Sequence, residues 1–235
     1  MDTAVIAGVG PGLGSSLARA FARQGFAIAL LSRHAESSEP VARELCSSGA
    51  SVLVVPTDIT DLQAVTTAVA IVKSQLGSIT VLAYNASGYG RGPFLGLDPG
   101  VFRQSFEVGV LGAVHLAQAV IPDMLAAGRG FISFTGATAA LRGRAGFAPL
   151  SIAKAGLRML AQSLAREFHP RGIHVIHVIV DGQIDTPKLR ARDPQRSAET
   201  MIAPDTIASC ILTAFAQPPD GWSHEIDIRP HVEPF

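Results

Sequence analysis

Short apolar runs rich in β-branched residues alternate along the chain with longer segments in which apolar and polar residues are mixed. The runs have the length of strands and cover residues 4–8, 26–31, 51–55, 79–84, 130–135, 172–180 and 224–228. Between them the apolar residues recur at helical spacing, for example at Leu62, Val65, Val69 and Val72. Nearly continuous apolar strands separated by helices predict a largely parallel sheet that is buried on both faces.

This alternation predicts an α/β fold with a single Rossmann-type, doubly wound domain over residues 1–235. We expect a mostly parallel seven-stranded sheet with helices on both faces, because seven apolar runs are present. Asp61 and Asp98 stand where capping residues would begin two helices, and Pro99 suits a first helical turn.

Three segments depart from a plain alternation of strand and helix. Residues 185–204 gather Arg190, Arg192 and Arg196 among prolines and polar residues, and we predict a mobile flap over a binding site. Residues 98–128 and 147–171 form long helical stretches that are apolar on more than one face. Such helices usually pack on more than a sheet, so we predict a homodimer or a homotetramer.

The amino-acid composition excludes several classes of binding partner. The 235 residues are 48% hydrophobic, and 19 basic residues balance 19 acidic ones, so we expect no nucleic-acid partner and no anionic membrane surface. The apolar runs fall short of the roughly 20 residues that span a bilayer, and no signal peptide is evident. The two cysteines and scattered histidines have no metal-ligand spacing. We therefore expect a cytoplasmic protein without a metal.

The first strand leads into a glycine-rich turn, and a helix follows with Ser15, Ser16 and Leu17. The turn contains Gly8, Gly10, Gly12, Leu13 and Gly14. Glycines at this spacing let a backbone approach a pyrophosphate, whose charge is met by the N–H groups at the helix start. An ordinary tight turn is the alternative, but the position between the first strand and a helix favours a dinucleotide site.

The second strand ends at Ser32 and Arg33, where no acid stands. An acid at this place would bind the ribose hydroxyls of NAD(H), whereas an arginine accepts the 2′-phosphate of NADP(H). Arg33 therefore favours NADP(H) over NAD(H), with a solvated surface arginine as the alternative.

At this point the chain resembles the short-chain dehydrogenase/reductase family over nearly its whole length. The glycine turn is similar to the family's T-G-x-x-x-G-x-G, residues 84–87 to its N-N-A-G, and residues 181–186 to its P-G-x-I-x-T. The resemblance implies that Asp58 and Ile59 meet the adenine and that Asn85 and Ala86 end the fourth strand. It also implies that Ile184 and Thr186 lie at the nicotinamide.

The catalytic tetrad of that family is incomplete here. The resemblance keeps Lys154, which would hold the nicotinamide ribose, but Leu150 stands in the place of the tyrosine and Ala137 in that of the serine. Gly109 occupies the place of the asparagine. A positioned general acid contributes about 10²–10⁴ in rate, so we expect slow or absent turnover by the usual mechanism.

Two hydroxyl residues near the expected pocket, Thr138 and Tyr89, are candidate substitutes, although each has an ordinary structural explanation. Arg142 and Arg144 indicate either an anionic ligand or solvated loop charges. Two functions remain open. One is an oxidoreductase that acts on a small carbonyl or alcohol through an unassigned proton relay. The other is a catalytically inactive NADP(H)-binding sensor or oligomeric scaffold.

Overall fold

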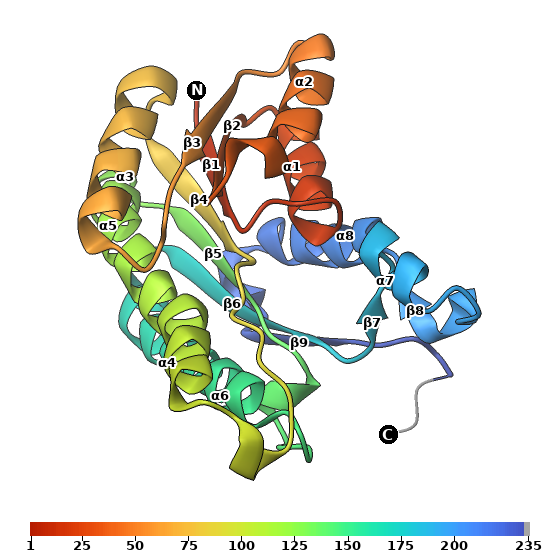
Figure 1. Ribbon diagram of the computed structural model, residues 1–235. Helices are drawn as coiled ribbons and strands as arrows, with labels where there is room; N and C mark the ends of the chain where they lie inside the picture. Colours follow the sequence, from red (N-terminus) through yellow and green to blue (C-terminus); the bar gives the residue numbers. More distant parts are fainter. Residues whose placement is uncertain (233–235) are drawn as a thin grey trace.

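A computed structural model describes residues 1–232 and contains the predicted parallel sheet (Figure 1). Its order is β3-β2-β1-β4-β5-β6-β9, and every neighbouring pair is parallel. The strands are β1 (Thr3–Ala7), β2 (Ala27–Ser32), β3 (Val52–Pro56), β4 (Ile79–Tyr84), β5 (Gly130–Thr135), β6 (Ile173–Val180) and β9 (Glu225–Ile228). The predicted fold class is confirmed, and each predicted strand lies within one residue of the observed one.

Helices cover both faces of the sheet (Figure 1). One face carries α1 (Leu13–Arg23), α2 (Glu39–Ser47) and α8 (Pro204–Phe215). The other carries α3 (Leu62–Leu76), α5 (Gly112–Ala127) and α6 (Ala148–Phe168), with α4 (Pro99–Phe106) beside α6. Each face has its own apolar core, which explains why strands buried on both sides read as continuous apolar runs.

Single turns of 3-10 helix fill several connections between these elements. They are η1 (Ala35–Ser37), η2 (Phe94–Gly96), η4 (Thr138–Ala140), η5 (His169–Arg171), η6 (Ala198–Thr200) and η7 (Pro219–Gly221). Asp61 and Asp98 cap α3 and α4 with their side chains, as predicted.

The predicted helix over residues 98–128 is divided in the structure. A π-helical turn, η3 (Glu107–Leu111), separates α4 from α5, and the hydroxyl of Tyr84 donates a hydrogen bond to the Val108 carbonyl within it. By length and composition alone the stretch Pro99–Ala127 could cross a membrane. Half of its most apolar window is buried inside the protein, as in the core helix of a globular domain.

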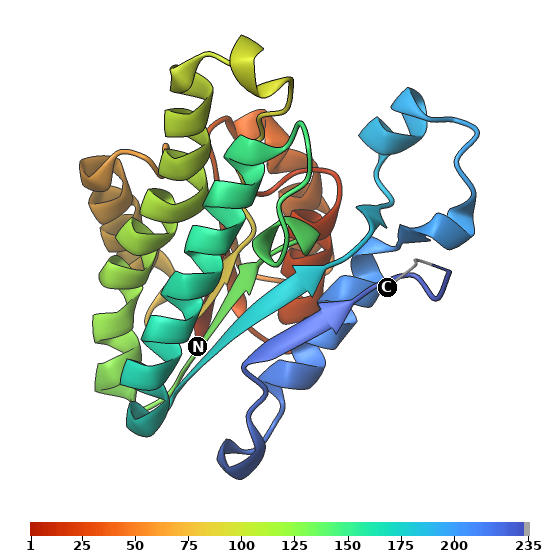
Figure 2. The same cartoon turned by 90° about the horizontal axis from the view of Figure 1, so that it is seen from below.

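The segment of residues 185–204 folds into its own small unit. The two-stranded sheet of β7 (Gln183–Ile184) and β8 (Met201–Ile202) joins its ends, and α7 (Pro187–Arg192) lies between them. Figure 2 shows the segment projecting from the edge of the domain. The sequence pattern did not predict β7 or β8, because two-residue strands carry no periodicity. The mobility of this flap stays a prediction.

Candidate functional site

The glycine turn lies at the carboxyl end of β1 and leads directly into α1. Helix α1 begins at Leu13, two residues before the predicted start, and no side chain caps it at Gly12. Helices α3 and α4, in contrast, have aspartate caps. The first N–H groups of α1 therefore lack a side-chain acceptor, which is the arrangement that binds phosphate at a helix start.

Three of the turn glycines are required by close packing. A Cβ on Gly8, whose φ is +86°, would lie 2.5 Å from the Ala86 nitrogen, and one on Gly14 would lie 2.5 Å from the Gly8 oxygen. A Cβ on Gly12 would lie 2.9 Å from the Thr186 methyl group. Among the residues that the structure describes, no atom lies within 4 Å of the same position on Gly10. Gly10 thus leaves open space beside the backbone, where a ligand could approach.

The amide of Asn85 holds the turn in place. Its Nδ2 donates a hydrogen bond of 2.9 Å to the Gly8 carbonyl, and its backbone N–H donates to the Ala7 carbonyl at 2.8 Å. The end of β4 is thereby fastened to the end of β1.

A cavity of about 650 Å³ brings together six of the thirteen residues predicted to bind a cofactor. Its lining includes Gly8, Arg33, Asp58, Ile59, Asn85 and Ala86. Arg33 is exposed at the rim. Asp58 accepts hydrogen bonds from the backbone and hydroxyl of Thr60, and these hold the pKa of its carboxyl below the usual value. An open glycine, an uncapped helix and a rim arginine fit an adenosine that carries phosphate groups.

Lys154 lies on α6, one helical turn after Leu150. Its side chain is buried, and Nζ donates a hydrogen bond of 2.6 Å to the Thr135 carbonyl at the end of β5. Burial lowers the pKa of Lys154 to about 8. The amine is therefore held at the strand end by a neutral acceptor.

A second cavity, of about 520 Å³, lies at the carboxyl ends of β5 and β6 and contains two of the vacant catalytic positions. Ala137 and Leu150 both line it and present only hydrocarbon. Thr138 lines the same cavity. Tyr89, the other candidate substitute, lines the first cavity and is 59% exposed. Of the two candidates, only Thr138 shares a cavity with the vacant positions.

The third vacant position, Gly109, lies in the π-helical turn and is buried. A Cβ at this residue would lie 2.8 Å from the Cβ of Ala153 on α6. The position is therefore closed by packing between η3 and α6.

Asp181 stands at the proline position of the motif that residues 181–186 resemble, and in the structure it is a central polar group of the second cavity. Its side chain is 5% exposed and accepts a hydrogen bond from the Thr138 hydroxyl. Arg229 lies 3.3 Å and Arg142 3.8 Å from its Oδ2. The available signal was an acid directly after a long apolar strand, where burial of a carboxylate requires partners.

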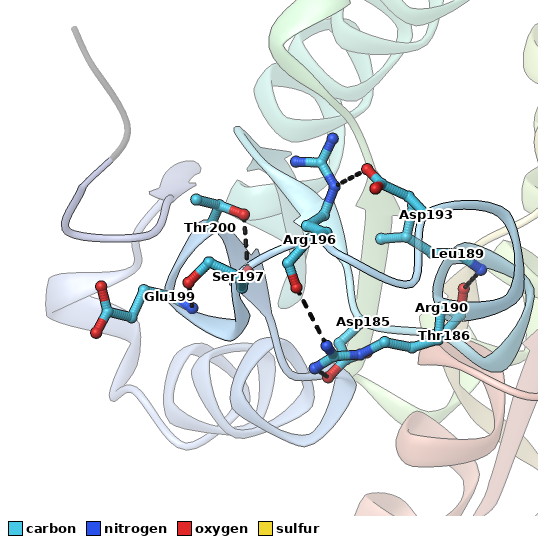
Figure 3. Close-up of polar contacts among 9 residues, drawn as sticks. All are labelled: Asp185, Thr186, Leu189, Arg190, Asp193, Arg196, Ser197, Glu199 and Thr200. Carbon is cyan, nitrogen blue, oxygen red and sulfur yellow. Dashed lines mark hydrogen bonds and ion pairs between the residues drawn. The ribbon is translucent and has the colours of Figure 1, made fainter.

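Thr186 and Ile184 lie at the base of the flap. The Thr186 hydroxyl accepts a hydrogen bond of 3.2 Å from the Leu189 N–H and so caps α7, while Ile184 lies in β7. Figure 3 shows the ion pairs that hold the flap together, Asp185 with Arg190 and Asp193 with Arg196.

A buried histidine on β6 also lies near the site. His177 Nδ1 pairs with Glu225 Oε2 at 2.9 Å, and Arg158 holds the same carboxylate through two hydrogen bonds. Burial lowers the pKa of His177 to about 4, so the ring is neutral at ordinary pH. A Cβ on Gly136 would lie 2.3 Å from its Nε2. Within residues 1–232 no group of three potential ligands could hold a metal ion.

Comparisons with known proteins agree with this arrangement. The sequence profile of the family described as short chain dehydrogenase matches residues 2–197. The cis-4-hydroxycyclohexanecarboxylate dehydrogenase of Sinomonas cyclohexanicum is 32% identical over 185 residues, which are 78% of this chain and 74% of that protein.

Solved structures resemble the chain along its whole length. A short-chain dehydrogenase from Rhodopseudomonas palustris has a TM-score of 0.84 and 31% identity, with 98% of this chain and 99% of that one covered. A metagenomic short-chain oxidoreductase in complex with NADP has a TM-score of 0.83 and 25% identity, with 98% of both chains covered.

Proposed function

Because the chain belongs to the short-chain dehydrogenase family, as its motifs predicted, we propose that it is an NADP(H)-binding oxidoreductase that acts on a small carbonyl or alcohol. The observation that carries this proposal is the uncapped start of α1 beside the open Gly10, next to a cavity with Arg33 at its rim. The relative solved with NADP supports the choice of cofactor. When bound, the nicotinamide would supply the hydride acceptor or donor.

The chain's own residues would hold the cofactor in defined places. The N–H groups of α1 would meet the pyrophosphate, Arg33 the 2′-phosphate, and Asp58 and Ile59 the adenine. Lys154 would meet the nicotinamide ribose, and Ile184 and Thr186 would lie near the carboxamide.

Proton transfer would depend on Thr138 rather than on the vacant positions. Since its hydroxyl proton is donated to Asp181, the Thr138 oxygen can accept a hydrogen bond from an alcohol in the cavity. Leu150 and Ala137 can neither donate nor accept. Turnover without a tunable phenol would be slow, because a general acid or base contributes about 10²–10⁴ in rate.

Fluorescence titration with NADPH and NADH tests the cofactor assignment. We expect NADPH to bind more tightly than NADH and Arg33→Gln to remove most of that difference, with Arg23→Gln as the surface control. Equal affinity for the two cofactors would reject the NADP(H) assignment. A panel of carbonyls and alcohols on the same sample then tests for turnover.

An inactive NADP(H)-binding sensor or oligomeric scaffold is the second candidate. The observation that favours it is the apolar lining at Ala137 and Leu150 together with the closed position at Gly109. Tight NADPH binding without turnover of any substrate in the panel would support this function over the first.

We also propose a homodimer or homotetramer in the cytoplasm. Three exposed apolar side chains, those of Phe106, Ile152 and Met159, support the assembly. Ile152 and Met159 lie on α6 on either side of Gly156, and a Cβ on Gly156 would lie 3.7 Å from the Phe106 ring. A second copy would cover this face, and Ile152→Lys should shift the mass measured by light scattering toward the monomer. A wild-type protein that is monomeric at micromolar concentration would reject the assembly. Fractionation of cells tests the location.

A further inference from the structure

The cavity that contains Ala137, Leu150 and Thr138 is enclosed by two segments that are far apart in the sequence. The connection from β5 to α6 contributes Arg142 and Arg144, and the flap contributes Arg196 and Thr200. Residues of both segments line one space of about 520 Å³, large enough for a small organic molecule.

The lining of this cavity is positively charged. Arg142, Arg144 and Arg196 all line it, and Asp181 is the one carboxylate among its lining residues. Arg229, from outside the lining, already lies 3.3 Å from Asp181. Arg142 lies 3.8 Å from the same carboxylate, and within residues 1–232 no ion pair joins Asp181 to Arg144 or Arg196.

The two arginines from different segments retain donors for a ligand. Arg196 binds Asp193 through Nε, and Figure 3 shows its two terminal nitrogens directed away from that carboxylate. Arg144 lies with its guanidinium 5.8 Å from the Phe147 ring centroid, and in the part of the chain that the structure describes its N–H groups make no hydrogen bond or ion pair. Five N–H donors in a planar fork match the two oxygens of a carboxylate.

We propose that this cavity binds the substrate as a small hydroxy acid whose carboxylate is held by Arg144 and by Arg142, and covered by Arg196 of the flap. Arg142, at 3.8 Å, is the more distant of the two arginines that pair with Asp181. The inference rests on the proposed function, because it names the substrate class of the same site. The hydrocarbon of Leu150 and Ala137 receives the apolar body of the acid.

The hydroxyl of the substrate is recognised by Thr138. The N–H groups of Leu141 and Arg142 donate to the Thr138 carbonyl at 2.9 Å and 3.2 Å, so one tight turn presents both the hydroxyl acceptor and the first arginine. Since the Thr138 proton is engaged with Asp181, its oxygen accepts from an alcohol.

Calorimetric titration with 4-hydroxybenzoate and its neutral isostere 4-hydroxybenzamide, with and without saturating NADPH, tests the proposal. We expect the acid to bind at least about tenfold more tightly than the amide. Arg142→Gln and Arg144→Gln should each weaken binding of the acid by about tenfold and leave binding of the amide unchanged. Arg166→Gln, an exposed arginine far along α6, is the matched control and should change neither.

The sign of the Asp181→Asn effect separates charge from damage to the cavity. Removing this negative charge should tighten binding of the acid, whereas binding that weakens as much as in the arginine variants would overturn the proposal. Equal binding of acid and amide, or tighter binding of phenyl phosphate than of the acid, would also overturn it. Thermal unfolding of each variant identifies any that fail to fold. If one of the two arginine variants does not fold, the binding measured with the other decides whether the proposal holds.

The NADPH titration keeps the two proposals distinguishable. Charge-dependent binding of the acid without NADPH binding would reject the oxidoreductase and retain the cavity assignment. NADPH binding with no discrimination between acid and amide would reject the cavity assignment alone.

Discussion

A Cβ placed on Gly109 would lie 2.8 Å from the Cβ of Ala153, so the π-helical turn η3 and helix α6 meet where a side chain has no room. Carbon atoms attract one another best near 3.5–4.0 Å and repel strongly at shorter distances. The vacancy at the position that resembles the tetrad asparagine is therefore a property of how two helices pack.

The first prediction follows from this contact. Gly109→Ala should destabilise the protein by roughly 1–3 kcal/mol through overpacking, although alanine is the better helix former. Adding Ala153→Gly should make the double variant less destabilised than the sum of the two single changes. Urea unfolding measures both. Gly143→Ala, at a site with open space, is the control. Unchanged stability of Gly109→Ala would contradict the close packing.

The second prediction concerns the apolar cavity wall. The double variant Leu150→Tyr, Ala137→Ser restores a phenol and a hydroxyl, and NADPH-dependent carbonyl reduction should rise by about 10²-fold or more. The matched control is Leu150→Phe, Ala137→Ser, which adds the ring without its hydroxyl. Initial rates on one carbonyl substrate compare the two. Equal rates would mean that ring packing, and not proton transfer, causes the gain.

The third prediction concerns the buried amine of Lys154, whose pKa falls from 10.5 to about 8. Between these values the unfolded chain binds more protons at this site than the folded protein, so the stability that the site contributes rises with pH. Relative to Lys154→Met, the wild type should gain about 3 kcal/mol of unfolding free energy over that range. Urea unfolding of both proteins at several pH values measures the difference. A difference that does not change with pH would refute the lowered pKa.

The fourth prediction concerns Tyr84, which is fully buried, with its pKa raised by burial, and which donates to the Val108 carbonyl in η3. Tyr84→Phe should lower the unfolding free energy by about 1 kcal/mol, because the Val108 carbonyl loses a hydrogen-bond partner. Chemical denaturation measures it. Tyr89→Phe, on an exposed ring, should change stability by less than about 0.5 kcal/mol. Equal effects of the two substitutions would argue against a specific role for the Tyr84 bond.

Much of the fold was predictable from local patterns. The strands at 79–84 and 130–135 agree with β4 and β5 at both ends, because continuous apolar runs bounded by turns leave few alternatives. Asp61 and Asp98 cap the helices they were expected to cap, since a capping bond spans only two or three residues. The start of α1 was placed too late, because its cap carries no polar side chain.

The candidate site was predictable only where it depends on local sequence. The glycine turn and Arg33 follow strands directly, so their place at the sheet edge could be inferred. The π-helical turn η3 could not be predicted from local sequence, because it is stabilised by a hydrogen bond from Tyr84 on β4. The role of Asp181 was missed for the same reason: its partners Thr138 and Arg142 come from the connection between β5 and α6, and Arg229 comes from the end of the chain's last strand.

The sequence by itself determined the alternation of strands and helices, the phosphate-binding turn, and the absence of hydroxyl groups at 137 and 150, since each is a matter of residue type and near neighbours. Only the tertiary structure decided that Gly109 is closed by Ala153, and that Thr138 bonds Asp181 in a cavity lined by arginines of two segments. The physical reason is range: helix, strand and turn preferences act over a few residues, whereas buried polar groups and close packing require partners that only the folded chain brings together.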